Sequence, residues 1–147
     1  MRYQAVIFDM DGVLTDSEWF IAEAGRIMFQ ENHGVAVSHD DFKPFVGFGE
    51  NRFLGGVAAR YGVAAFDLER DKARTYRIYC DLVEGKLKEL PGAAAFVRRC
   101  RTSGLKTALA TSTDRIKMEA NLRAIDRCSG RSLGRYISPC THLGKKL

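Results

Sequence analysis

The chain has 147 residues, of which 46% are hydrophobic and 28% charged, a composition typical of a globular protein with its own core and unlike that of a disordered chain. No apolar run is long enough for a membrane span, and the first residues show no signal or transit peptide, which predicts an intracellular, cytoplasmic location. The net charge of +5 arises in residues 127–147, which hold five basic residues and no acid, whereas residues 1–126 hold 18 of each sign, and we expect no nucleic-acid partner from a basic tail alone.

The first half of the chain begins with one apolar run and continues with helical patterns. Residues 4–8 read Gln-Ala-Val-Ile-Phe, a continuous apolar run that predicts a buried strand of a parallel sheet. Ser17 is expected to be the N-cap of a helix that ends at Gly34. Further helical segments are expected after Ser38, over residues 50–61, and after Asp67 as an N-cap.

The second half has the order helix, strand and helix. A helix is expected to follow Pro91-Gly92 and to end at Gly104, and residues 105–110 predict a second strand. Thr113 is expected to cap the last helix. This order predicts an α/β fold with parallel strands and right-handed crossovers, namely a partial doubly wound, Rossmann-like core with a helical insert. The predicted division is residues 1–16 and 86–126 for the core, 17–85 for the insert, and 127–147 for an irregular basic tail with a short strand at 136–138.

Polar side chains come directly after each of the two predicted strands. Asp9 and Asp11 follow the first strand, and Thr111 and Ser112 follow the second. Since ligands bind beyond the carboxyl ends of parallel strands, these side chains are expected to face one cleft. Two carboxylates so close together are costly unless a cation neutralises them, and Mg²⁺ prefers such oxygen ligands. One aspartate can then attack phosphorus while the other moves protons, and a hydroxyl can bind the phosphoryl group. The alternative is that the two aspartates only form a turn or a helix cap.

The string from Asp9 to Ser17 (DMDGVLTDS) resembles the first motif of the haloacid dehalogenase (HAD) superfamily, which consists mostly of phosphatases. Thr111, in LKTALATSTD, stands where the second motif has its phosphate-binding Ser or Thr. The helical insert resembles the cap of the β-phosphoglucomutase-like branch. The stretches FVGFGENRFLGGVA and STDRIKMEANL resemble the HAD domain of plant suppressor-of-quenching-type proteins, and the resemblance covers residues 4–125.

The resemblance implies a Mg²⁺-dependent phosphohydrolase that acts on a small phosphorylated metabolite. It implies Asp9 as the nucleophile that forms an aspartyl-phosphate and Asp11 as the general acid and base. Both are implied as metal ligands, Asp11 through its backbone carbonyl, and Thr111 and Ser112 are implied as phosphate-binding residues. The third-motif lysine and the fourth-motif acid lie beyond position 125 in the family, and residues 127–147 contain no acid. We therefore expect a C-terminally truncated, impaired enzyme that binds Mg²⁺ weakly or not at all. The alternative is an inactive HAD-like chain that acts as a binding or regulatory protein.

Three further expectations depend on the same resemblance. Arg52 is a weak candidate for a substrate contact from the cap, and a solvated helix face is the alternative for it. The strand at residues 4–8 is expected to have an open edge, which favours self-association. The resemblance also offers the chloroplast as an alternative location.

Overall fold

The computed structural model describes residues 3–129 and 138–139. The chain divides into two compact units, one formed by residues 1–17 and 84–147 and the other by residues 18–83. We call the first the strand unit and the second the helical unit. None of the helices in the described part of the chain is long and apolar enough to cross a membrane.

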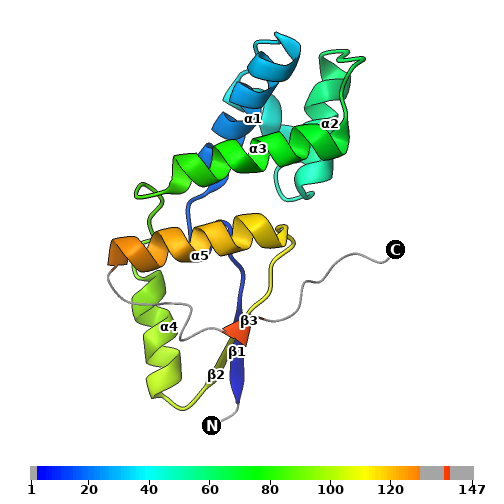
Figure 1. Ribbon diagram of the computed structural model, residues 1–147. Helices are drawn as coiled ribbons and strands as arrows, with labels where there is room; N and C mark the ends of the chain where they lie inside the picture. Colours follow the sequence, from blue (N-terminus) through cyan, green and yellow to red (C-terminus); the bar gives the residue numbers. More distant parts are fainter. Residues whose placement is uncertain (1–2, 130–137, 140–147) are drawn as a thin grey trace. The chain divides into compact units, whose positions relative to one another are not determined.

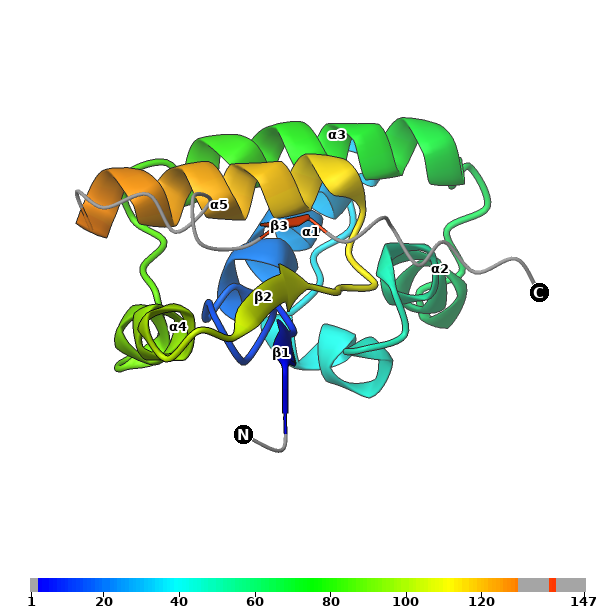
Figure 2. The same ribbon diagram turned by 90° about the horizontal axis from the view of Figure 1, so that it is seen from below.

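The strand unit contains a small parallel sheet (Figures 1 and 2). Strand β1 (Ala5–Phe8) pairs in parallel with β2 (Lys106–Leu109), from Ala5 opposite Lys106 to Phe8 opposite Leu109. A short β3 (Ser138–Pro139) pairs in parallel with β2, so the strand order is β1-β2-β3. Helices α4 (Ala93–Thr102) and α5 (Arg115–Ser129) complete the unit. The predicted α/β fold with a parallel sheet is confirmed.

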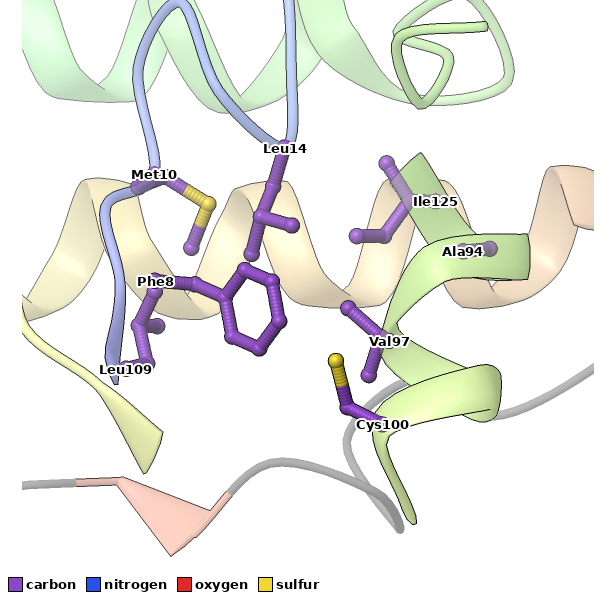
Figure 3. Packing of buried hydrophobic residues seen from close by; sticks show 8 residues of the cluster. All are labelled: Phe8, Met10, Leu14, Ala94, Val97, Cys100, Leu109 and Ile125. Carbon is purple, nitrogen blue, oxygen red and sulfur yellow. The ribbon is translucent and has the colours of Figure 1, made fainter. Parts of the chain in front are cut away.

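One apolar cluster holds the sheet, the loop after β1 and the two helices together (Figure 3). The ring of Phe8 lies among side chains from all of these elements, and its centroid is 6.0 Å from that of Phe96 in an edge-to-face contact. Such a contact contributes about 1 kcal/mol beyond area burial. The buried members of the cluster are Phe8, Met10, Leu14, Ala94, Val97, Cys100, Leu109 and Ile125.

The predicted burial of the first strand holds for one face only. Phe8 is buried and Val6 packs partly against the apolar cluster, whereas Ile7, which points to the opposite face, is 65% exposed. Side chains alternate between the faces of a strand, so helices that cover one face leave the other open. Within the described residues β1 has a partner on one side only, because β3 pairs with β2. Of the predicted strand at 136–138, only Ser138 lies among the described residues, and it belongs to β3.

The helical unit consists of α1 (Glu18–His33), the 3₁₀ helix η1 (His39–Phe45), α2 (Glu50–Arg60) and α3 (Leu68–Val83). Helices α1 and α3 lie side by side and make the most extensive contact of the unit (Figure 1). The predicted cap at Asp67 is confirmed, because its Oδ1 accepts a hydrogen bond of 2.8 Å from the Arg70 amide. The fully buried side chains include Met28, Phe29, Phe42, Leu54 and Tyr79.

Two adjacent glycines in α2 provide a matched pair of stability tests. A Cβ at Gly56 would lie 2.3 Å from the Phe45 ring, whereas a Cβ at Gly55 would meet nothing within 4 Å. We expect Gly55→Ala to raise the free energy of unfolding by about 0.5–1 kcal/mol, because alanine favours a helix. Gly56→Ala should lower it by about 1–3 kcal/mol through overpacking. Urea unfolding followed by the fluorescence of Trp19, the only tryptophan in the chain, measures both; equal effects of the two changes would contradict this packing.

Candidate functional site

The loop that follows β1 is a tight, hydrogen-bonded turn. The Met10 carbonyl accepts hydrogen bonds from the amides of Leu14 at 2.9 Å and Thr15 at 3.0 Å. Gly12 has a φ of +74° and donates its amide to the Thr15 carbonyl at 2.9 Å. Since this φ favours glycine, Gly12 allows the chain to turn back immediately after Asp11. The turn holds both aspartates at the carboxyl end of the sheet.

Asp9 and Thr111 leave neighbouring strands at the same end of the sheet. The Ala110 amide donates to the Phe8 carbonyl at 2.9 Å, so β1 and β2 are still paired where these residues begin. The Asp9 side chain is exposed, and its Oδ1 accepts a hydrogen bond of 2.7 Å from the Met10 amide. Thr111 is half-buried, and its Oγ1 accepts a hydrogen bond of 3.2 Å from the Thr113 amide, which leaves the hydroxyl proton for another acceptor.

Asp11 is the most heavily bonded side chain of this region. Its Oδ2 accepts hydrogen bonds from the Thr113 hydroxyl at 2.6 Å and from Lys117 Nζ at 3.0 Å. Its Oδ1 accepts from the Ser17 hydroxyl and, at 3.5 Å, from Asn121 Nδ2. All four donors belong to buried residues, whereas Asp11 itself is half-buried. The carboxylate is therefore fixed in one orientation.

The surroundings of Asp11 favour its charged form. Burial raises the pKa of the Asp11 carboxyl, but the Lys117 charge and the hydrogen bonds from Ser17 and Thr113 outweigh burial and hold that pKa below its ordinary value. In this arrangement Asp11 is held as a carboxylate and is a poor proton donor.

Of the four residues that donate hydrogen bonds to Asp11, two were predicted in another role and two were not predicted. Ser17 and Thr113 were predicted as helix caps. Ser17 directly precedes α1 as expected, whereas α5 begins at Arg115, two residues after Thr113, and the hydroxyls of both residues donate to Asp11. Lys117 and Asn121 were not predicted at all. A signal was present, because positions 117 and 121 are four apart and therefore share one face of the helix. That face is polar and yet buried.

The described residues do not by themselves form a complete magnesium site. Asp9 offers an exposed carboxylate, but the Asp11 carboxylate is already bonded to four donors. Within residues 3–129 and 138–139, no three His, Cys, Asp or Glu side chains lie together as a metal-binding group. Mg²⁺ takes near-octahedral oxygen coordination and keeps several waters. Two aspartates, one of them ion-paired, therefore fit at most a weakly held ion.

Two other predicted site residues are at the surface. Ser112 is exposed at the end of the loop after β2. Arg52 belongs to the helical unit, where its guanidinium carbon lies 5.2 Å from the centroid of the exposed Phe48 ring. This cation–π contact holds Arg52 over Phe48 at the start of α2.

The parallel sheet and the aspartates at the carboxyl end of β1 define an α/β protein with a candidate site at the ends of its strands. The family model for "haloacid dehalogenase-like hydrolase" matches residues 3–143, and the chain belongs to this family. Protein SUPPRESSOR OF QUENCHING 1, chloroplastic, from Arabidopsis thaliana is 46% identical over 125 residues, which are 84% of this chain and 12% of that protein. Phosphorylated carbohydrates phosphatase from Thermotoga maritima is 33% identical over 127 residues, which are 84% of this chain and 56% of that protein.

Solved structures extend the likeness to the fold. A Thermotoga maritima crystal structure named provisionally as a beta-phosphoglucomutase is 31% identical, with a TM-score of 0.66, and the match covers 92% of this chain and 59% of that one. CbbY from Rhodobacter sphaeroides, solved with phosphate, is 19% identical with a TM-score of 0.76, and the match covers 98% of this chain and 66% of that one. The recognition of a HAD-like chain is confirmed, one of its solved neighbours carries a beta-phosphoglucomutase name, and the chain spans 59% and 66% of these two structures.

Proposed function

We propose that the chain is a phosphohydrolase of the HAD type that acts on a small phosphorylated metabolite through an aspartyl-phosphate at Asp9. Asp11 serves as the proton-transfer residue, and Thr111 and Ser112 bind the phosphoryl group. The observation that carries the proposal is the placement of an exposed Asp9 carboxylate and the Thr111 hydroxyl at the ends of paired strands. The named phosphatase relative from Thermotoga supports the substrate class.

The first chemical step uses Asp9 as the nucleophile. One carboxylate oxygen of Asp9 attacks phosphorus, the bond from phosphorus to the ester oxygen breaks, and the leaving oxygen takes up a proton. The surroundings of Asp11 favour its carboxylate, so it is a poor proton donor in this arrangement. An aryl phosphate, whose leaving group needs little protonation, is therefore the best first substrate.

The second step uses Asp11 in its carboxylate form. Water attacks phosphorus, Asp11 accepts a proton from that water, and the bond between phosphorus and the Asp9 oxygen breaks to release inorganic phosphate. The Thr111 hydroxyl donates a hydrogen bond to the phosphoryl oxygens in both steps. Helix α5 begins three residues after Ser112, so its N-terminal amides and dipole favour an anion at this end of the sheet.

The test is the release of p-nitrophenol from p-nitrophenyl phosphate, with Mg²⁺ and with a chelator. We expect slow turnover that needs Mg²⁺ at roughly millimolar concentration, because the described residues supply few fixed ligands. Turnover that persists in chelator, or no turnover at any Mg²⁺ concentration, would contradict the proposal.

A second candidate function is binding or regulation without turnover. The observation that favours it is the full engagement of Asp11, whose carboxylate already accepts bonds from Ser17, Thr113, Lys117 and Asn121. Such a chain would bind inorganic phosphate at Thr111 and Ser112 but release no p-nitrophenol. Phosphate titration of the inactive chain separates this candidate from a chain with no site.

The helical unit and Arg52 complete the proposal. The helical unit serves as a cap, and Arg52 binds a second anionic group of the substrate.

Since the Arabidopsis relative is named as chloroplastic, we propose the chloroplast rather than the cytoplasm as the location, to be tested by imaging a fluorescent fusion of the whole gene product.

We expect the chain to self-associate through β1. Among the described residues the outer side of β1 has no strand partner, and Ile7 is 65% and Tyr3 is 73% exposed. An open apolar edge favours pairing between chains, and a charged residue on such an edge suppresses it. Analytical ultracentrifugation should detect concentration-dependent dimers that Ile7→Lys abolishes and Ile116→Lys, a change on exposed α5 surface, does not. A monomeric wild-type chain at all concentrations would contradict this expectation.

A further inference from the structure

Lys117 is a buried lysine in a region built around two acids. Its side chain is only 6% exposed, and its Nζ lies 3.0 Å from Asp11 Oδ2 and 3.5 Å from Thr113 Oγ1. The ion pair joins α5 to the loop after β1, across 106 positions of sequence. Burying an ammonium group is costly unless a close opposite charge and hydrogen bonds compensate it, so the position of Lys117 depends on Asp11.

The loop after β1 carries an acidic pair, Asp9 and Asp11, which stand two positions apart at the carboxyl end of β1, and the described residues assemble no three-ligand metal group around them. Lys117 supplies a cation to Asp11 from the protein itself, fixed by the helix on which it stands.

We propose that Lys117 is the built-in counter-ion of Asp11, and that it weakens divalent-cation binding by the acidic pair. Its ammonium lies against Asp11 where the positive charge of a metal ion would otherwise be favoured. The resting chain therefore stays folded without a metal, and a metal ion near Asp9 must bind against the charge of Lys117. The counter-ion role of Lys117 concerns the resting chain and needs no turnover. It can therefore fail while the proposed phosphatase activity holds, and the phosphatase activity can fail while the counter-ion role holds.

The direct test is Mg²⁺ affinity, measured by isothermal titration of the full chain. Lys117→Met keeps the length of the side chain and removes its charge, so Mg²⁺ should bind at least about tenfold more tightly than to the wild type. Lys117→Arg keeps the charge and should leave the affinity near the wild-type value. Lys86→Met removes an exposed charge of the same unit and serves as the matched control. An unchanged or weaker affinity in Lys117→Met would overturn the proposal.

A second measurement separates the counter-ion role from simple packing. The melting temperature of Lys117→Met should rise when Mg²⁺ is added, whereas that of the wild type should change little, since only the variant leaves Asp11 uncompensated. If Lys117→Met does not fold, the double change Lys117→Met/Asp11→Asn should fold, because it removes both charges. Failure of the double variant to fold, or a Mg²⁺ response equal to that of the wild type, would show that Lys117 acts through packing alone.

Discussion

Replacing Asp9 by Asn is expected to abolish the release of p-nitrophenol. The amide of asparagine is neutral and cannot attack phosphorus, so no aspartyl-phosphate forms and the second step has no substrate. The side chain is exposed and its Oδ1 has one local partner, the Met10 amide, so the fold should tolerate the change. We expect turnover to fall by at least about a thousandfold with little change in the melting temperature.

The control for this prediction is Asp81→Asn. Asp81 is an exposed residue of α3, so the same change of charge occurs far along the sequence from the first motif. It should leave turnover at the wild-type level. Substantial residual turnover in Asp9→Asn, at a rate above that of a mock preparation, would rule out Asp9 as the nucleophile.

Replacing Asp71 is expected to cause the largest loss of stability in the helical unit. Its carboxylate is fully buried and accepts hydrogen bonds from Asn32 at 2.7 Å, from the Asp67 amide at 2.9 Å and from Arg70 at 3.0 Å, while His33 Nε2 lies at 2.9 Å. These contacts tie the end of α1 to the start of α3. Asp71→Ala removes the acceptor that these donors share, of which only the His33 side chain is itself buried, and should lower the free energy of unfolding by about 2–3 kcal/mol.

The effect of Asp71 should depend on pH in a defined direction. Burial raises the pKa of the Asp71 carboxyl, but the hydrogen bonds, led by those from Arg70 and Asn32, hold that pKa well below its ordinary value. A group with a lowered pKa stabilises the fold above its unfolded pKa of about 4, and this contribution is lost as the pH falls below that value. Urea unfolding followed by Trp19 fluorescence should therefore give a difference between wild type and Asp71→Asn that is constant near neutral pH and shrinks in acid. The exposed Asp81→Asn should have little effect at any pH, and a pH-independent difference for Asp71→Asn would contradict this account.

The local patterns of this sequence predict the elements well, because strands and helices depend on apolar spacing and capping residues. The run at residues 4–8 and the segment at 105–110 became β1 and β2, and the Asp67 cap lies where it was expected. The exposure of Ile7 could not be read from that run. Burial of a strand depends on what packs against each face, which a single segment does not encode.

The candidate site was predicted only in part, because some of its residues follow from the order of the elements and others depend on tertiary packing. Asp9, Asp11 and Thr111 follow strands directly, so the order of elements places them at one end of the sheet. Lys117 and Asn121 stand on a buried polar face of a helix, and this face was not predicted, because charged residues are rarely buried unless they are paired. Pairing across 106 positions is a tertiary property, and it appears only when α5 is packed against the loop after β1.

The most direct test of the account is to trap the covalent intermediate. The chain is mixed with p-nitrophenyl phosphate and Mg²⁺, quenched in acid, reduced with borohydride and digested for mass spectrometry. Borohydride reduces an acyl phosphate but not a free carboxylate, so the mass of the reduced side chain marks the residue that carried the phosphoryl group. The account predicts reduction at Asp9 in the wild type and none in Asp9→Asn. Phosphate release with no reduction at Asp9, or reduction at another carboxylate, would contradict it.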